Sequence, residues 1–316
     1  MISTETYNPA NNSHVVQYGV WPDCCNCCDF CLRLNRKSTT NNAKIRLIEM
    51  IRENINHIDW KNKFSYGISL LGGELFYIKN RDVQDHFMLL IDDIIDKILI
   101  PGYEYTKFST VTNGIYDPAF LYRVVDRIVD RVGIERVDVN FSYDLKYRYR
   151  VEKARLKAYN NINAFHDRYN YCVGIQMILT QYVINLWKAG KFDVNQFIDE
   201  NFPGNRLAFL YPHPIHTGKV LPDFNFNRRD FLDFVTYLKS ANYEAYLNFI
   251  NSTKNSGTFK YTGLRDKKNN CQDQQPILSD GKEQINDKCG HSTLYQCYAD
   301  CDKCVLCDLK LIDPDL

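Results

Sequence analysis

The chain has 316 residues, with 39 lysines and arginines against 38 aspartates and glutamates and a formal net charge of +1. This length suffices for one large domain and a small appendage, and the balanced charge argues against a nucleic-acid partner. Because the first twenty residues lack the apolar core of a signal peptide and charges interrupt every longer apolar run, we expect a cytoplasmic protein with no membrane partner.

Strand-like and helix-like patterns alternate six times along the chain. Short apolar runs predict strands at 15–20, 66–71, 106–111, 137–142, 172–180 and 206–211. Amphipathic stretches predict helices at 43–58, 82–99, 117–132, 150–168, 193–201 and 228–241. This alternation is typical of an α/β fold with a parallel sheet, and right-handed crossovers let six such units curl into a partial (β/α)6 barrel. We expect the barrel in residues 1–245 and a small cysteine-rich domain in 246–316.

The first predicted strand leads directly into a cysteine-rich loop, with five cysteines in residues 24–31. Three of them, Cys24, Cys28 and Cys31, have the spacing C-x3-C-x2-C, with Phe30 before the last. Three thiolates on one short loop can hold three corners of a four-iron cluster. The alternative is a structural zinc site, but no second pair of cysteines or histidines follows closely. Twelve cysteines without a secretion signal favour metal or redox chemistry over disulfides.

Polar residues also stand where the next three predicted strands end. These strands end in Gly72-Gly73-Glu74, Thr112-Asn113-Gly114 and Ser142-Tyr143-Asp144. Each alone is an ordinary turn or cap signal. Active sites of parallel barrels lie at the C-terminal ends of the strands. The cysteine loop and these three strand ends are four such signals in order, and together they predict a functional site there.

The third predicted helix carries Arg123, Arg127 and Arg131 in alternation with Asp126 and Asp130. Opposite charges at this spacing are typical of a solvated, ion-paired helix face. We therefore do not expect these arginines to form a phosphate-binding track.

Taken together, residues 14–240 resemble the radical S-adenosylmethionine (radical SAM) enzymes. The spacing of the three cysteines, with Phe30 before the last, matches the family motif C-x3-C-x-aromatic-C in full. The three strand ends are similar to the family's as well, although many members have proline where Leu75 follows Glu74. Residues 149–153 (YRVEK) resemble the start of the fourth helix in the peptide- and sulfatase-modifying branch.

The resemblance implies a [4Fe–4S] cluster on Cys24, Cys28 and Cys31, with the remaining iron chelated by SAM. Cys25 and Cys27 are then extra; a Cys25-Cys28-Cys31 set stays open, but the family spacing favours Cys24. The SAM-binding residues implied by the resemblance are Gly72, Gly73, Glu74, Asn113, Ser142, Asp144, Arg150 and Thr180.

The resemblance also assigns roles to these residues. The two glycines let the backbone approach closely, and Glu74 would accept hydrogen bonds from the SAM amine. Arg150 would pair with the SAM carboxylate, since guanidinium forks suit carboxylates. Ser142 and Asp144 would bond the ribose. Reductive cleavage of SAM would then give a 5′-deoxyadenosyl radical that removes a hydrogen atom from the substrate.

After about residue 245 the chain becomes polar and then cysteine-rich. Ser279-Asp280-Gly281 separates two short runs as in a β-hairpin. This arrangement resembles the SPASM/twitch appendages that hold auxiliary iron–sulfur clusters, and a zinc knuckle is the alternative. The ligands would be a subset of Cys271, Cys289, Cys297, Cys301, Cys304 and Cys307.

Three further residues carry weaker signals. Cys172, inside the fifth predicted strand, is expected to be an inert buried thiol. His213 and His216 lie just past the sixth strand, where they would contact substrate or adenine, or have no special role.

We thus expect a radical SAM enzyme that uses a low-potential donor such as flavodoxin or ferredoxin. A peptide or protein side chain is the favoured substrate. The alternatives within the class are activation of a glycyl-radical partner and modification of a small metabolite or nucleoside. Outside the class, the alternative is a non-catalytic zinc or iron–sulfur module. Because the first predicted strand begins almost at once, we expect no leader-peptide-binding domain before it.

Overall fold

The structure is a computed structural model, and it describes residues 3–8, 13–26, 28, 38–57, 66–102, 106–149, 151–210, 223, 226–255, 284–286 and 291–293. They fall into two compact units, Met1–Ile175 and Gln176–Leu316, and the division lies within one strand, β6. The predicted border between residues 245 and 246 falls inside a helix, α8.

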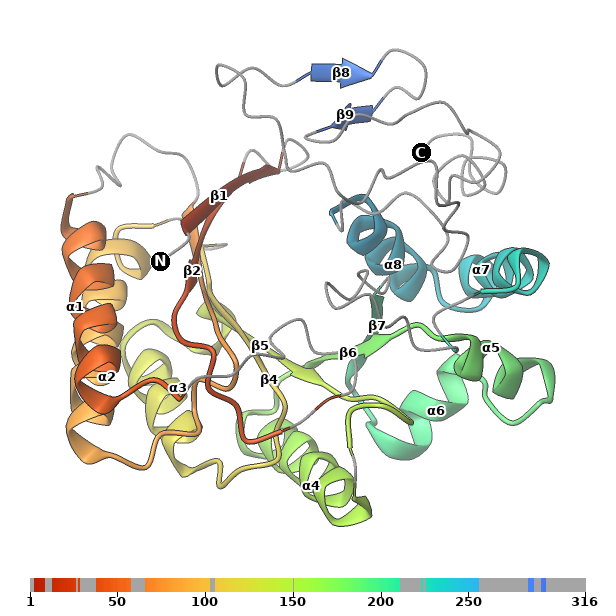
Figure 1. Ribbon diagram of the computed structural model, residues 1–316, viewed down its shortest axis with the longest axis horizontal. Helices are drawn as coiled ribbons and strands as arrows, with labels where there is room; N and C mark the ends of the chain where they lie inside the picture. The colour runs from red at the N-terminus through yellow and green to blue at the C-terminus, as the bar shows by residue number, and fades with distance from the viewer. Residues whose placement is uncertain are drawn as a thin grey trace. The chain divides into compact units, whose positions relative to one another are not determined.

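Seven strands form one open sheet whose order follows the chain (Figure 1). They are β1 (Ser3–Asn8), β2 (Ser13–Gly19), β3 (Tyr66–Leu71), β4 (Phe108–Thr112), β5 (Val137–Ser142), β6 (Gly174–Ile178) and β7 (Arg206–Leu210). The pairs β2–β3, β3–β4 and β4–β5 are parallel, as right-handed crossovers produce. The fold is therefore α/β and of the partial-barrel type, as predicted.

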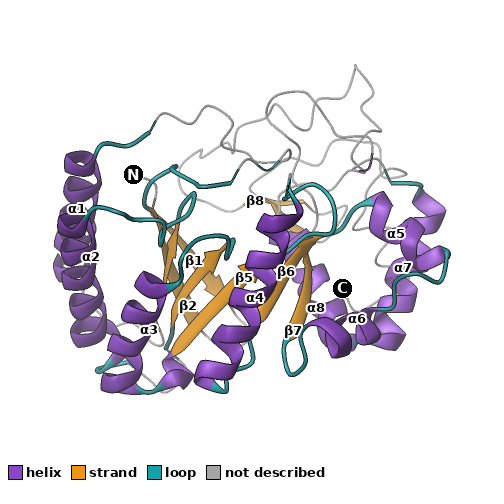
Figure 2. Cartoon of the chain, turned by 90° about the horizontal axis from the view of Figure 1, so that it is seen from below, coloured by secondary structure: helices purple, strands orange, loops and turns teal. Residues whose placement is uncertain are grey.

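The helices follow the strands in alternation. They are α1 (Asn41–His57), α2 (Arg81–Ile94), α3 (Ala119–Val132), α4 (Glu152–Tyr169), α5 (Gln181–Lys188), α6 (Val194–Asn201), α7 (Arg228–Ala241) and α8 (Tyr243–Asn255). Helix α2 continues into a π-helical turn, η2 (Ile95–Leu99), and a 3₁₀ turn, η3 (Ile134–Arg136), precedes β5. Figures 1 and 2 show α1, α2 and α3 side by side along the strands of the first unit.

All six predicted strands and all six predicted helices are present, with boundaries shifted by a few residues. Three elements were not predicted: the helices α5 and α8, and β1, which pairs antiparallel with β2. The prediction for Cys172 was wrong, because β6 begins only at Gly174 and Cys172 is exposed.

The described part of the C-terminal region contains one short β-hairpin. The short strands β8 (Gln284–Asn286) and β9 (His291–Thr293) do pair antiparallel. Their connection is therefore residues 287–290, whereas Ser279-Asp280-Gly281 lies outside the described residues.

An aromatic cluster fills the core next to the strand ends of the first unit. The ring of Phe87, from α2, packs edge-on against Trp21, Phe76 and Phe120, with centroids 5.7–6.3 Å apart. Phe76 also stacks on Tyr116 at 6.4 Å. Burying aromatic rings of this size contributes about 1.5–3 kcal/mol each. Because Trp21, Phe76 and Tyr116 follow β2, β3 and β4, the cluster holds the starts of three loops together.

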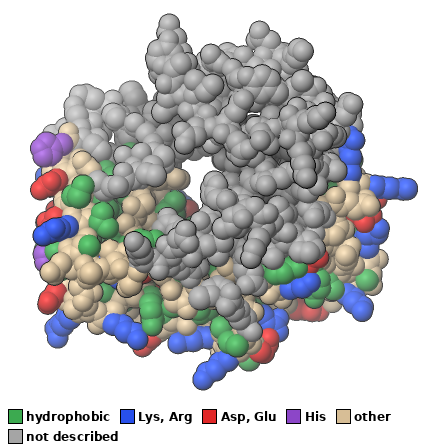
Figure 3. All heavy atoms as spheres, viewed as in Figure 1, with side chains coloured by type: hydrophobic (Ala, Val, Ile, Leu, Met, Phe, Trp, Pro, Cys, Tyr) green, Lys and Arg blue, Asp and Glu red, His purple; other side chains and the backbone are tan. Residues whose placement is uncertain are grey.

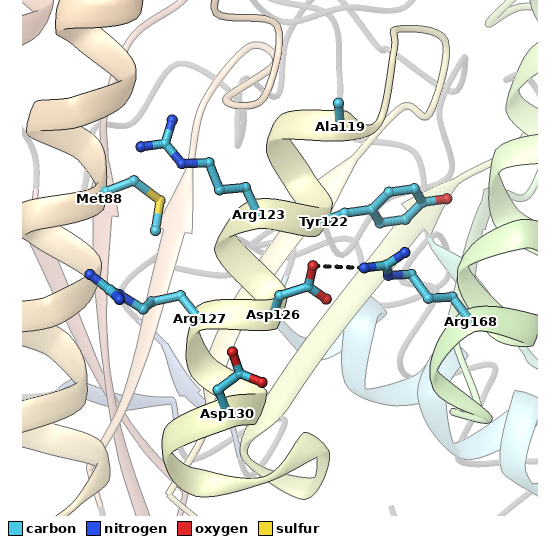
Figure 4. A pocket seen from close by; sticks show the side chains of 8 residues that line it. All are labelled: Met88, Ala119, Tyr122, Arg123, Asp126, Arg127, Asp130 and Arg168. Carbon is cyan, nitrogen blue, oxygen red and sulfur yellow. Dashed lines mark hydrogen bonds and ion pairs between the residues drawn. The ribbon is translucent and has the colours of Figure 1, made fainter.

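The α3 arginines are ion-paired as predicted, but mostly across helices. Arg127 binds Asp92 of α2 at 2.8 Å, and Arg123 and Arg131 bind other α2-side aspartates. Asp126 pairs instead with Arg168 of α4 (Figure 4). A groove of about 560 Å³ lies beside these ion pairs. It is lined by Met88, Ala119, Tyr122, Arg123, Asp126, Arg127, Asp130 and Arg168.

The surface of the described part carries both signs of charge. Figure 3 shows blue basic and red acidic side chains interspersed along this face. Within the described ranges, every helix is too short or too polar to cross a bilayer.

Candidate active site at the strand ends of the first unit

The cysteine loop is fastened to the loop that follows β3. The parallel pairing of β2 and β3 continues beyond the strands, because Gly73 N–H donates to the Trp21 carbonyl at 2.8 Å. Glu74 N–H then donates to the Asp23 carbonyl at 2.6 Å. These bonds place the backbone just before Cys24 directly beside Glu74.

This close approach explains both glycines. A Cβ atom on Gly73 would lie 2.1 Å from the Asp23 carbonyl oxygen and 2.3 Å from that of Pro22. A Cβ on Gly72 would lie 3.0 Å from the Trp21 oxygen and 2.4 Å from Leu75. The Gly-Gly pair is therefore needed for the cysteine loop itself, whatever else binds there.

Asp23 closes the far end of the same loop. Its Oδ1 accepts the Thr39 N–H at 2.9 Å, and Lys44 Nζ lies 3.6 Å from its Oδ2. Burial opposes ionisation, but these donors outweigh it and hold the pKa of Asp23 below its ordinary value. Asp23 thus anchors both ends of the loop. Its backbone carbonyl binds Glu74 N–H, and its carboxylate binds Thr39 N–H and lies near Lys44.

Asn26 brings two of the predicted ligand sulfurs into one place. Its backbone N–H lies 3.4 Å from Cys24 Sγ, and its side-chain amide donates to Cys28 Sγ at 3.3 Å. The same amide also donates to the Arg148 carbonyl at 3.0 Å. Cys28 is buried and Cys24 is half-buried. N–H donors of this kind favour the thiolate form that metal binding requires.

Asn113, after β4, links the cysteines to the loop after β3. Its side-chain amide donates to Cys24 Sγ at 3.4 Å, and its backbone N–H donates to Glu74 Oε2 at 2.8 Å. Cys25 also reaches this amide, with its thiol 3.8 Å from Asn113 Oδ1. Hydrogen bonding to Cys24 and burial raise the pKa of the Cys25 thiol above its ordinary value.

Glu74 is almost fully buried, at 1% exposure. Its Oε1 accepts the Thr112 hydroxyl at 2.9 Å and the Phe76 N–H at 3.4 Å. Burial nevertheless raises the pKa of Glu74 to about 8, because the hydrogen bonds compensate the lost hydration only in part. A carboxyl in this state is stabilised as an anion by any cation that binds next to it.

A short hydrogen-bond chain fixes the orientation of Glu74. The Thr112 hydroxyl gives its only proton to Glu74, so the Tyr116 hydroxyl, 2.7 Å away, must donate to Thr112. Burial raises the pKa of Tyr116 well above its ordinary value, which keeps this donor protonated.

The end of β5 carries a buried ion pair. Arg148 Nε donates to Asp144 Oδ2 at 2.5 Å, and both side chains are at most 12% exposed. Arg148 Nη1 also lies 3.9 Å from Cys28 Sγ. Ser142 is buried, and its carbonyl accepts the Tyr149 hydroxyl at 2.9 Å. The fourth strand end is therefore joined to the cysteine loop as well.

The described residues thus bring together six of the predicted site positions in the first unit: Cys24, Cys28, Gly73, Glu74, Asn113 and Asp144. In the second unit, Thr180 accepts the Val183 N–H at 3.4 Å and caps α5. The predicted positions outside the described residues are Cys27, Phe30, Cys31, Arg150, His213, His216 and the six C-terminal cysteines.

Three contributors were not identified from the sequence. Asn26 lies inside the cysteine run, Tyr116 lies in the turn after β4, and Arg148 lies two residues before Arg150. None stands in a recognisable pattern, and Arg148 gains its role through Cys28, 120 residues away in the chain.

The donor chemistry fits a thiolate-bound cluster. Soft sulfur ligands surrounded by N–H donors are typical of iron–sulfur sites. Within the described part of the chain, His, Cys, Asp and Glu side chains do not gather in threes at metal-binding range. The two sulfurs held by Asn26 need a third ligand, and the predicted one, Cys31, lies outside that part.

Comparison with known proteins supports the fold. Neither a protein-family model nor a curated protein matches the sequence significantly. Similar solved structures include "Native anSMEcpe with bound AdoMet and Cp18Cys peptide", at 14% identity with a TM-score of 0.51, and "Native anSMEcpe with bound AdoMet and Kp18Cys peptide", at 16% with a TM-score of 0.50. Each match covers 74% of this chain and 60% of that chain. Both neighbours have AdoMet bound, and their similarity to this chain confirms the predicted fold.

Proposed function

We propose that this chain, which has the fold of the radical SAM enzymes, binds a [4Fe–4S] cluster through Cys24, Cys28 and Cys31 and uses it to cleave SAM. The observation that carries the proposal is the convergence of Cys24 and Cys28, both held by Asn26, with buried Glu74, which Asn113 joins to Cys24. When bound, the cluster would supply the electron for splitting SAM into methionine and a 5′-deoxyadenosyl radical, which would take a hydrogen atom from the substrate.

The residues of the chain bind and orient the reactants. Glu74 accepts the SAM ammonium group, whose positive charge offsets the cost of burying the carboxylate. Arg150 pairs with the SAM carboxylate by its guanidinium fork, and Ser142 bonds the ribose. Glu74 is only 1% exposed, so the surrounding protein keeps water away from its carboxylate.

For the substrate we favour a peptide or protein side chain. Two similar structures hold a bound peptide, and residues 149–153 resemble the start of the fourth helix in the peptide- and sulfatase-modifying branch. A flavodoxin or ferredoxin would supply the electron. The substrate proposal is tested by offering peptides with deuterated side chains: transfer of deuterium into 5′-deoxyadenosine supports it, and transfer only from deuterated metabolites contradicts it.

The cleavage proposal is tested by anaerobic reconstitution with iron and sulfide. Iron and sulfide per chain are measured, and 5′-deoxyadenosine is quantified after SAM and dithionite are added. We expect iron, sulfide and SAM cleavage together. Zinc without iron, or iron without cleavage under strong reduction, would instead support the second candidate, a non-catalytic zinc or iron–sulfur module.

The ligand assignment has its own matched pair of variants. Cys24→Ala should abolish cleavage, whereas Cys25→Ala should retain it, because the family spacing C-x3-C-x2-C runs through Cys24 and not through Cys25. Cys28→Ala and Cys31→Ala should behave like Cys24→Ala. If Cys25→Ala abolishes cleavage and Cys24→Ala retains it, the third ligand is Cys25 and not Cys24.

A further inference from the structure

We infer that Arg148 is a positioning residue of the cluster site, which holds Cys28 and raises the reduction potential of the cluster bound there. The inference rests on the proposed function, since it concerns the same cluster. It goes beyond that function because it assigns an electrostatic role to a residue outside the family motifs.

The first support is geometric. Arg148 joins two elements that are 120 residues apart in sequence, since its Nη1 lies 3.9 Å from Cys28 Sγ. A second bond fixes the same segment, because the Asn26 amide donates both to the Arg148 carbonyl at 3.0 Å and to Cys28 Sγ at 3.3 Å. The turn after β5 is therefore fastened to the cysteine loop from the backbone and from the side chain.

The second support is the orientation of the ion pair. Asp144 takes the Nε edge of the guanidinium at 2.5 Å, so Nη1 is the edge that faces the sulfur. Both partners are largely buried, and an arginine side chain stays charged in proteins. Asp144 thus fixes the orientation of the Arg148 guanidinium group, whose Nη1 points to the Cys28 sulfur.

The charge then has a definite effect on the cluster. Reduction adds one negative charge to the cluster, and a buried cation next to a ligand sulfur stabilises the reduced form. N–H donors to ligand sulfurs act in the same direction. Arg148 accordingly makes the cluster easier to reduce, while the carboxylate of Asp144 opposes that effect from a position behind the guanidinium.

The test is a redox titration of the reconstituted protein, with the reduced cluster followed by electron paramagnetic resonance. We expect Arg148→Met to disfavour reduction about tenfold, which is a potential about 59 mV more negative for a one-electron couple. Arg148→Lys, which keeps the charge, should retain most of the wild-type potential. Asp144→Asn should shift the potential in the opposite direction, because it removes the opposing negative charge.

The opposite signs separate this role from a merely structural one. Loss of packing would move both Arg148→Met and Asp144→Asn in the same direction or lower the iron content of both alike, and either result would overturn the inference. The matched control is Arg127→Met, which breaks an exposed Arg–Asp pair between α2 and α3 and should leave the potential unchanged. If the wild-type protein binds iron and cleaves SAM but the opposite shifts are absent, only this inference fails. If it binds no iron, the proposed function fails first.

Discussion

Glu74 combines near-complete burial with a carboxyl group that must ionise to hold a cation. Its pKa of about 8 lies above the ordinary value of 4.5, so the folded protein binds this proton more tightly than the unfolded chain does. Stability from this group is therefore present below about pH 4.5 and is lost as the pH rises towards 8. In the cluster-free protein, we expect the free energy of unfolding to fall by up to about 1.4 kcal/mol for each pH unit in that window.

The variant that isolates this effect is Glu74→Gln, which is neutral at every pH and keeps an oxygen for the Thr112 hydroxyl. Denaturant unfolding between about pH 5 and pH 8, under reducing conditions, should show a smaller fall of stability for the variant than for the wild type. Identical pH slopes for the two proteins would mean that Glu74 is ionised throughout.

Tyr116 acts on Glu74 only through Thr112, and its hydroxyl can be removed without changing its ring. Tyr116→Phe should keep the stacking with Phe76 but release the Thr112 hydroxyl from its fixed direction. One neutral hydrogen bond is worth about 0.5–1.5 kcal/mol, so we expect SAM affinity to fall about 2- to 10-fold, measured by equilibrium dialysis on the reconstituted protein.

Tyr169→Phe serves as the control for this prediction. It also removes one tyrosine hydroxyl bond, at 2.7 Å to Asp126, but on the helical surface of α4. Its SAM affinity should equal that of the wild type. Equal losses in both variants would show that the effect is general destabilisation.

At the residue scale, the sequence predicted the positions that follow a short pattern and missed the partners that only folding supplies. Gly73 and Glu74 could be picked out because each stands at a strand end. Their tasks could not, since the need for Gly73 comes from the carbonyl of Asp23, and the environment of Glu74 comes from Thr112 and Tyr116.

At the scale of elements, the loop after β3 and the cysteine loop behave as one unit, and Gly73 is where they meet. Gly73→Ala would place a methyl group 2.1 Å from the Asp23 carbonyl oxygen, so the two backbones must separate. We expect this variant to lose most of its iron on reconstitution while the sheet stays folded, as measured by iron content and circular dichroism.

Gly190→Ala is the matched glycine variant. Gly190 has a φ of +66° with open space around its Cα, so alanine there adds backbone strain of about 1 kcal/mol but no collision. It should lower stability modestly and leave iron content unchanged. Equal iron loss in both variants would contradict the idea that Gly73 serves the cysteine loop in particular.

Periodicity predicted the long elements well and the short or unexpected ones poorly. β3, β5 and α7 have the predicted boundaries, because their apolar residues follow one period throughout. Helix α5 begins directly after the predicted end of the fifth strand at residue 180 and was missed, although α6, which also has eight residues, was predicted. Helix α8 was not predicted, because only Asn242 separates it from α7 and the sequence shows no clear start for a second helix.

At the scale of the whole molecule, the alternation of strands and helices was enough to predict the α/β class and the partial barrel. The border between the two compact units falls within β6, and no change of composition marks that point. A sheet that continues through a strand gives the sequence no linker by which such a border is recognised.

The C-terminal cysteines bear on how many clusters the whole molecule carries, and we propose one auxiliary site there. Six cysteines suffice for one four-cysteine cluster, so the reconstituted wild type should hold about eight irons per chain. Replacing Cys271, Cys289, Cys297, Cys301, Cys304 and Cys307 by Ala together should leave about four irons and preserve the SAM cleavage that depends on Cys24. About four irons plus one zinc in the wild type, with only the zinc lost in the variant, would identify a zinc knuckle instead. We expect the two sites to load independently, because the ligands proposed for them are separate sets of cysteines.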